Sequence, residues 1–98
     1  MELRIATYTF AGDPDDLMRR AGRGLRPIVE AEPGFKGYTV AIGGAEIVSI
    51  SVWDSRAEAE NGSAAVASWV AANMSEISLI GVRYADVKFS TVFGVTTA

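Results

Sequence analysis

The segment EIVSISVWDSR, residues Glu46–Arg56, predicts a β-strand that runs directly into the start of a helix. Strand side chains alternate between two faces. One face carries the aliphatic residues Val48, Ile50 and Val52, and the other carries Ile47, Ser49, Ser51 and Trp53. Asp54 or Ser55 can cap the helix, with Glu58 completing a capping box after Ser55. We expect the aliphatic face to pack against helices and the mixed face to need another cover.

Length and composition indicate one globular domain that spans residues 1–98. Apolar residues make up 49% and charged residues 21% of the chain, which is typical of a folded protein. The net charge of −3 argues against nucleic acid as the main partner, because no positive field attracts phosphates. The chain has neither cysteine nor histidine, so thiolate chemistry is excluded and the commonest metal ligand is missing.

The sequence contains no apolar run near the roughly 20 residues that a membrane-spanning helix needs. The first residues, Met1–Ile5, alternate as in a strand and do not resemble a signal peptide. We therefore expect a cytoplasmic protein without a membrane partner. Carboxylates are present but lack clustered ligand spacing, so we expect no metal site.

Turn and capping signals divide the chain into four strands and two helices. Asp13 and Pro14 begin the first helix, Gly22 and Gly24 weaken it, and Pro27 predicts a kink or break. The second helix begins at Asp54 or Ser55 and is expected to be interrupted near Gly62. The predicted strands are residues 3–10, 35–42, 46–53 and 82–95, with a turn at Gly43–Gly44 and a bulge or change of partner in the long last strand.

The order βαββαβ predicts an α+β, ferredoxin-like fold, with a four-stranded antiparallel sheet and both helices on one face. The residues expected to face the helices are Val40, Ile42, Val48, Ile50, Val52, Val87 and Phe89. The residues expected on the open face are Ala6, Tyr8, Phe10, Thr39, Ala41, Ile47, Ser49, Ser51, Trp53, Tyr84 and Val92.

An open face of this composition predicts a homodimer. Leaving Phe10, Ile47, Trp53 and Val92 in water would forgo on the order of 5–10 kcal/mol, which is comparable to the stability of a small domain. Two sheets packed face to face would bury these side chains. Small residues opposite aromatic ones would leave a gap, so the candidate pocket residues are Tyr8, Phe10, Ser49, Ser51 and Trp53.

Two motifs give the chain a resemblance to a known family. They are EPGFKG (Glu32–Gly37), before the second strand, and SVWDS (Ser51–Ser55), followed by a run rich in alanine and glutamate. Over almost the whole length the chain resembles the dimeric α/β-barrel proteins of the antibiotic biosynthesis monooxygenase type. The resemblance implies the ferredoxin-like fold and dimerisation, while the family includes monooxygenases, haem-degrading enzymes and members of no known activity.

The family's haem-degrading members carry a helix tryptophan and a histidine ligand. The matching positions fall near Gly62 and Ala72, and the chain has no histidine, so we expect no haem degradation and no cofactor. Members that oxidise aromatic polyketides without a cofactor carry Asn, Trp, Tyr and Arg near a pocket. By resemblance the catalytic candidates are Asn61, Trp69, Arg83 and Tyr84, although the spacing from Asn61 to Trp69 departs from that pattern.

Two functions remain open from the sequence. The first is a cofactor-independent monooxygenase that acts on a small aromatic or polyketide-like substrate, in a pocket between sheet and helices. The second is a non-catalytic dimeric protein that binds a small molecule or serves as an accessory. The residue types fit both, because Trp53 and Trp69 also suit a core and Arg83 also suits an ion pair.

Overall fold

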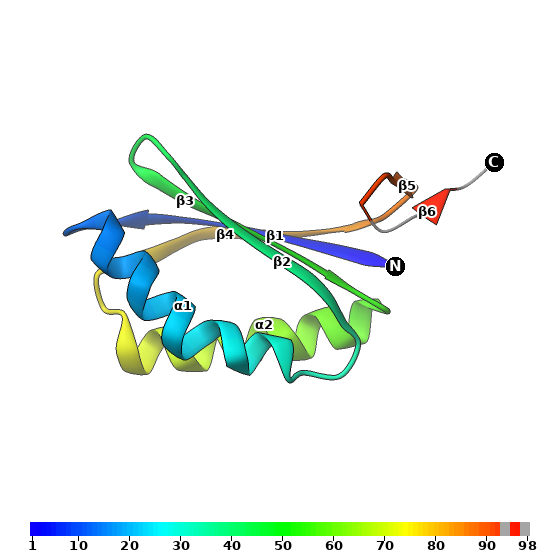
Figure 1. The fold of residues 1–98 in the computed structure, drawn as a ribbon, viewed down its shortest axis with the longest axis horizontal. Helices are drawn as coiled ribbons and strands as arrows, with labels where there is room; N and C mark the ends of the chain where they lie inside the picture. The colour runs from blue at the N-terminus through cyan, green and yellow to red at the C-terminus, as the bar shows by residue number, and fades with distance from the viewer. Residues whose placement is uncertain (93–94, 97–98) are drawn as a thin grey trace.

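The computed structural model describes residues 1–92 and 95–96. Its elements are β1 (Glu2–Phe10), α1 (Pro14–Glu30), β2 (Phe35–Gly43), β3 (Glu46–Trp53), α2 (Arg56–Asn73), β4 (Ile77–Asp86), β5 (Phe89–Ser90) and β6 (Val95–Thr96). The four long strands form one antiparallel sheet in the order β2-β3-β1-β4. Both helices lie against the same side of this sheet (Figure 1). The predicted ferredoxin-like βαββαβ fold is therefore confirmed.

Both helices begin where the capping signals predict. Asp13 is the N-cap of α1, where its Oδ1 accepts a hydrogen bond from the backbone N–H of Asp15, and Pro14 occupies the first turn. Ser55 caps α2 by accepting from the N–H of Glu58, and its hydroxyl donates to the Glu58 carboxylate at 2.9 Å. These caps satisfy amides that have no partner inside the helix.

Neither helix is broken, so the predicted interruptions are wrong. Helix α1 continues through the exposed Pro27 to Glu30, because a proline this close to the end removes only one of the helix's last hydrogen bonds. Helix α2 continues through Gly62, which lies directly over the indole of Trp53. A methyl group at Gly62 would overlap that ring, so this glycine allows a close approach of helix and sheet.

The last strand differs from its prediction at both ends. Strand β4 begins at Ile77, before the predicted start at residue 82, and ends at Asp86, before the predicted end at residue 95. Its pairing with β1 shifts register between Thr7 and Tyr8, opposite residues 79–81, which precede the predicted strand. The chain then forms the short hairpin β5–β6, so of the two expected alternatives the change of partner is present. Residues 93–94 of the predicted strand lie outside the described part of the chain.

The structure reverses the predicted faces of β3. The alternate residues Ile47, Ser49, Ser51 and Trp53 are at most 3% exposed and lie on the helix side. The β2–β3 hairpin pairs Val40 with Ser49 and Ile42 with Ile47, so the even positions of β2 share a face with the odd positions of β3.

The open face therefore carries a different set from the one expected. Strand register places Leu3, Ile5, Thr39, Ala41, Val48, Ile50, Val52, Arg83 and Ala85 on it. Ala6, Tyr8, Phe10 and Tyr84 belong instead to the clusters under the helices. Val87 and Phe89, expected to face the helices, line a hollow with Leu3, Ile50 and Val52, and Phe89 is 75% exposed. Val92, expected on the open face, is exposed.

The core between sheet and helices has two parts. Trp53 centres the first part, packed against Leu25 and Val29 of α1 and Val66 of α2, and Phe35 meets its ring edge-on at a centroid distance of 5.7 Å. The second part is built around Ala6, Tyr8 and Ile47. In the described part of the chain, neither helix is long and apolar enough to cross a membrane.

Candidate functional site

Polar side chains form a row across the helix-facing side of the sheet. Tyr38 on β2 pairs with Ser51 on β3, Ser51 pairs with Arg4 on β1, and Arg4 pairs with Tyr84 on β4. Paired residues of neighbouring strands present their side chains on the same face. Four polar side chains from four strands thus lie under the helices, where apolar residues are the rule.

The next row consists of smaller side chains and leaves space above the sheet. Ser49 and Ala6 are its two central members, and both are at most 3% exposed. A small cavity of about 30 Å³ lies here, between the sheet and both helices. Its walls are Tyr8, Tyr38, Val40, Ile47, Ser49 and Ile77 from the strands, Met18, Ala21 and Leu25 from α1, and Val66, Val70 and Met74 from α2 and its C-cap.

Two hydroxyl groups give this apolar cavity its polarity. Ser49 Oγ is buried and has no hydrogen-bond partner among residues 1–92 and 95–96. Burial raises the pKa of the Tyr38 phenol, and the neighbouring Ser49 hydroxyl lowers it in part, although the two hydroxyls are not in hydrogen-bonding geometry. An unsatisfied buried hydroxyl costs free energy, so a polar ligand atom placed here would recover it.

Arg4 is the least expected member of the polar row. Only 3% of its surface is exposed. Its Nε donates to Ser63 Oγ of α2 at 2.9 Å, and in the described part of the chain the guanidinium has no other hydrogen bond and no ion pair. Buried arginines are normally paired with acids. This one lies close enough to Tyr38 to affect the pKa of that phenol.

A groove on the outside of the protein leads to the cavity. It runs between α1 and the edge strand β2, encloses about 590 Å³, and is lined by Gly22, Arg26, Glu30 and Phe35 together with four residues that also line the cavity. The four shared residues are Met18, Ala21, Tyr38 and Val40. They form the wall between groove and cavity. Movement of the flexible Met18 side chain and the Tyr38 ring would join the two spaces.

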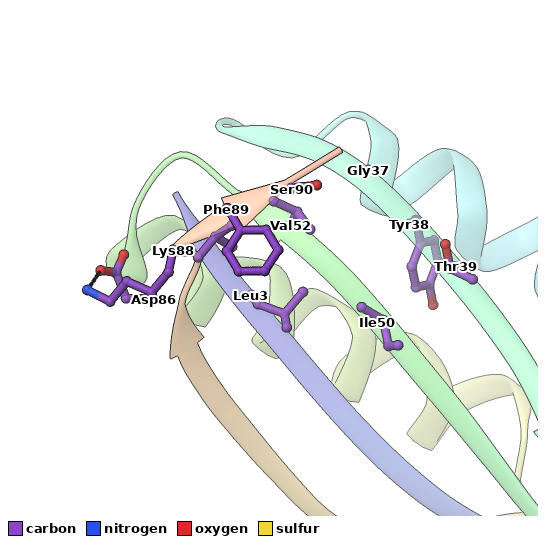
Figure 2. A pocket seen from close by; sticks show the side chains of 11 residues that line it. Leu3, Gly37, Tyr38, Thr39, Ile50, Val52, Asp86, Lys88, Phe89 and Ser90 are labelled. Atoms are coloured by element: carbon purple, nitrogen blue, oxygen red, sulfur yellow. Dashed lines mark hydrogen bonds and ion pairs between the residues drawn. The ribbon is translucent and has the colours of Figure 1, made fainter. Parts of the chain in front are cut away.

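A second hollow lies on the open side of the sheet. It has a volume of about 400 Å³, and strands β1 and β3 form its floor with Leu3, Ile50 and Val52 (Figure 2). Figure 2 shows the Phe89 ring beside Leu3 and Val52, and the ion pair of Asp86 with Lys88 at its margin. This hollow is apolar at its base and is separated from the cavity by the sheet.

The structure does not bring the four catalytic candidates together. Asn61 is exposed on α2, and Trp69 packs its ring against Gly24 of α1. Arg83 pairs with Ile5 and points to the open side of the sheet. Tyr84 lies on the helix side, where the Arg56 guanidinium covers its ring at 4.0 Å from the centroid.

The five pocket candidates all lie on the helix side, not between two sheets. Tyr8 and Ser49 line the cavity. Ser51 and Trp53 fill the core beside it, where the indole N–H donates to Ser51 Oγ at 2.9 Å. Phe10 packs at the edge of the cluster that contains Tyr8. A gap opposite small residues was expected between two sheets, and the structure places it under the helices.

Sequence reasoning did not single out Arg4 and Tyr38. Arg4 alternates in phase with Ala6 and Tyr8, and Tyr38 alternates in phase with Val40 and Ile42. A charged residue within an otherwise buried face was the available signal. Among the described residues no cluster of three or more acidic side chains could hold a metal ion.

Comparisons with known proteins show relatives by fold. No family model matches the sequence, and no curated protein matches it. The structure is similar to SnoaB, a cofactor-independent oxygenase from Streptomyces nogalater, with a TM-score of 0.74 and 15% identity over 92% of this chain and 95% of that one. It is also similar to the monooxygenase ActVA-Orf6 of Streptomyces coelicolor, solved with the ligand Nanaomycin D, with a TM-score of 0.70 and 19% identity over 91% of this chain and 88% of that one.

A third match is MupZ from Pseudomonas fluorescens, with a TM-score of 0.71 and 11% identity. It covers 85% of this chain, and this chain spans 65% of MupZ. At these identities the matches establish fold and not activity. The resemblance to the antibiotic biosynthesis monooxygenases that the motifs indicated is thereby confirmed over most of the chain, at the level of its ferredoxin-like fold.

Proposed function

We propose that this protein binds a small aromatic molecule with an acidic hydroxyl or enol between its sheet and helices, and oxidises it with dioxygen without a cofactor. The observation that carries the proposal is the mostly apolar cavity with the unsatisfied Ser49 hydroxyl and the Tyr38 phenol in its wall. A mostly apolar space with a few convergent polar groups is the usual form of a small-molecule site.

The chemistry requires little from the protein. An anthrone-type substrate has a methylene group whose deprotonation gives an electron-rich enolate, and this anion transfers electrons to dioxygen. The carbon loses two hydrogens and gains one oxygen atom, while the second oxygen leaves as water. The protein's part is to hold the anion, place a hydroxyl near the reacting oxygen and exclude water. Tyr38 and Ser49 are the groups positioned to do so.

Two relatives by fold support this chemistry. SnoaB is described as a cofactor-independent oxygenase, and ActVA-Orf6 as a monooxygenase with a bound ligand. We extend that activity to this chain as a proposal. Asn61, Trp69, Arg83 and Tyr84 remain candidates by resemblance, and Tyr84 is the one that shares the helix-facing polar row with Tyr38.

We also propose that the protein is a homodimer through the open face of its sheet. Leu3, Ile5, Val48 and Ile50 are half-buried there, and both helices lie on the opposite side (Figure 1). A second copy placed on this face would remove these aliphatic side chains from water. Sedimentation should show a dimer for the wild type and a folded monomer for Ile50→Lys, whereas Ile28→Lys, an exposed α1 control, should remain dimeric. A monomeric wild type at micromolar concentration would contradict the dimer.

Oxygen consumption with anthrone-type and quinol substrates tests the activity. We expect turnover by the wild type and a loss of about tenfold or more for Tyr38→Phe, because a positioned proton donor typically contributes at least that much. Thr39→Val removes a hydroxyl from the next residue of β2, on the other face, and should retain turnover. Arg83→Ala and Tyr84→Phe test the candidates named by resemblance. Background oxidation by every variant would remove the enzyme proposal for these substrates.

The non-catalytic alternative is favoured by one observation, which is the small volume of the cavity, about 30 Å³. This space holds about one water molecule. A binding or accessory protein would be stabilised by an aromatic ligand without consuming oxygen. Thermal unfolding with each substrate under nitrogen and under air therefore separates binding from turnover.

A further inference from the structure

We infer that Arg4 is the counter-ion of an organic anion bound between the sheet and the helices, so that the ligand of this site is an aromatic carboxylate, phenolate or enolate. The inference rests on the proposed small-molecule site and specifies the charge of its ligand. It assigns a binding role to a β1 residue that neither the sequence motifs nor the fold comparisons point to.

The main evidence is a positive charge that the fold buries without neutralising. Arg4 is 3% exposed, and within residues 1–92 and 95–96 its guanidinium has one neutral hydrogen-bond partner, Ser63. A buried charge without a partner costs several kcal/mol in a folded protein. The acid nearest along the strand face is Glu2, and its carboxylate lies 3.9 Å from Arg56. The guanidinium of Arg4 can therefore still pair with a negatively charged group.

The guanidinium is held in a fixed orientation towards its neighbours. Ser63 of α2 engages Nε, which leaves the two terminal nitrogens for another acceptor. Ser51 and Tyr84 flank Arg4 on the adjacent strands, and Ser51 is already occupied by the Trp53 indole. Tyr38 lies one strand further along the same row, at the wall shared by groove and cavity. An anion entering past Tyr38 would meet Arg4 across Ser51.

The shape of the space limits the rest of the ligand. The cavity has Ser49 in its wall on the sheet side and Leu25, Val66 and Met74 on the helix side, and Arg4 lies beyond this lining in the neighbouring row of the sheet. At about 30 Å³ it can take an aromatic ring only when movement of Met18 and Tyr38 joins it to the groove. A flat aromatic ring matches the layer between sheet and helices, and a single negative group matches one guanidinium. A ligand with several charges would leave the others without partners in this apolar space.

Paired probes of equal shape test the inference. The probes are 1-naphthoate, an anion, and 1-naphthamide, its neutral counterpart, with binding measured by calorimetry at pH 7. We expect the wild type to prefer naphthoate by about tenfold or more, as a charge-assisted hydrogen bond would produce. Arg4→Met should lose this preference and still bind naphthamide as the wild type does. Arg23→Met removes an exposed charge from α1 and should keep the preference, which controls for net charge.

Each outcome bears on the inference separately from the proposed oxidation. A wild type that binds both probes equally, or binds neither at millimolar concentration, overturns the inference, as does an Arg4→Met variant that still prefers naphthoate. Charge-selective binding that depends on Arg4, found in a protein that consumes no oxygen, supports the inference and removes the oxidation. Unchanged oxygen turnover by Arg4→Met supports the oxidation and removes the inference.

Discussion

Replacing Arg4 by methionine should make the protein more stable. The substitution keeps a flexible side chain of similar volume but shorter reach at a position that is 3% exposed, and it removes a charge that has no acid partner among the described residues. Replacing buried ionic groups by apolar ones of similar volume is often neutral or stabilising by about 1–4 kcal/mol. The hydrogen bond to Ser63 is lost, which costs about 0.5–1.5 kcal/mol.

The balance runs from about −0.5 to about 3.5 kcal/mol in the free energy of unfolding, and its centre is a gain of about 1.5 kcal/mol. For a domain of this size each kcal/mol moves the unfolding midpoint by about 4–8 °C. A structural arginine would behave in the opposite way, because its loss would weaken the packing that it supports. The sign of the change therefore separates a residue kept for a ligand from one kept for the fold.

Urea unfolding followed by tryptophan fluorescence provides the measurement, since Trp53 is buried in the core that unfolding exposes. All variants should be compared at one protein concentration, because dimerisation would make stability concentration-dependent. The control Arg23→Met should stay within about 0.5 kcal/mol of the wild type, as expected for an exposed position. A loss of more than about 1 kcal/mol for Arg4→Met would refute the reasoning.

Three further predictions follow from other contacts. Gly62→Ala should destabilise the protein by about 1–3 kcal/mol, because the new methyl group overlaps the Trp53 indole beneath α2. The methyl group of Gly22→Ala meets no atom, so this variant should be more stable than the wild type by about 0.4–1 kcal/mol. Urea unfolding of both variants distinguishes crowding from helix propensity. Burial raises the pKa of Tyr38 above its ordinary value of 10.0. The stability that the neutral phenol contributes is therefore complete below pH 10 and is lost as the pH rises through the higher folded pKa. Between about pH 9 and pH 11 the wild type should lose more stability than Tyr38→Phe. The hydrogen bond from Arg20 lowers the pKa of Glu76 below 4.5. The stability that this ion pair contributes is therefore present above pH 4.5 and lost as the pH falls through the lower folded pKa. Thermal unfolding across pH should show Glu76→Gln less stable than the wild type at neutral pH and equally stable near pH 2.

The order of strands and helices could be predicted from local signals. Asp13, Pro14 and Ser55 mark the helix starts by chemistry that acts within a few residues, and the structure uses each of them as predicted. The errors concern effects that depend on distant residues. Gly62 looked like a helix breaker because its contact with Trp53 joins two elements that the sequence shows separately.

The reversed faces of β3 could have been found from the hairpin. In a regular hairpin, the residue numbers of every cross-strand pair add up to the same value. A two-residue turn at Gly43–Gly44 gives the value 87, and the observed pairs, such as Val40 with Ser49, give 89. Both sums are odd, so either register puts the even residues of β2 beside the odd residues of β3. Hydrophobicity alone favoured Val48 and Ile50 for the helix side, although a sheet that is covered on both faces needs aliphatic residues on both.

The candidate site could be predicted only in part for a similar reason. Tyr8 and Ser49 were named because small residues opposite aromatic ones would leave a gap between two sheets, and they line a cavity on the helix side instead. Arg4 belongs to no motif that the sequence shows. Its burial depends on α2 crossing over β1, where the Arg4 side chain donates a hydrogen bond to Ser63. Arg83 and Tyr84 are neighbours in sequence but occupy opposite faces, as successive residues of a strand must.

Ser49 and Ser51 are two residues apart on β3, yet their hydroxyl groups differ in their hydrogen bonding. The hydroxyl of Ser51 accepts a hydrogen bond from the Trp53 indole, whereas that of Ser49 has no hydrogen-bond partner among the described residues. We therefore expect Ser49→Ala, which removes the hydroxyl, and Ser49→Cys, which replaces it by a thiol, to cost little folding stability. Substitutions at this position could change the polarity of the cavity without changing the fold.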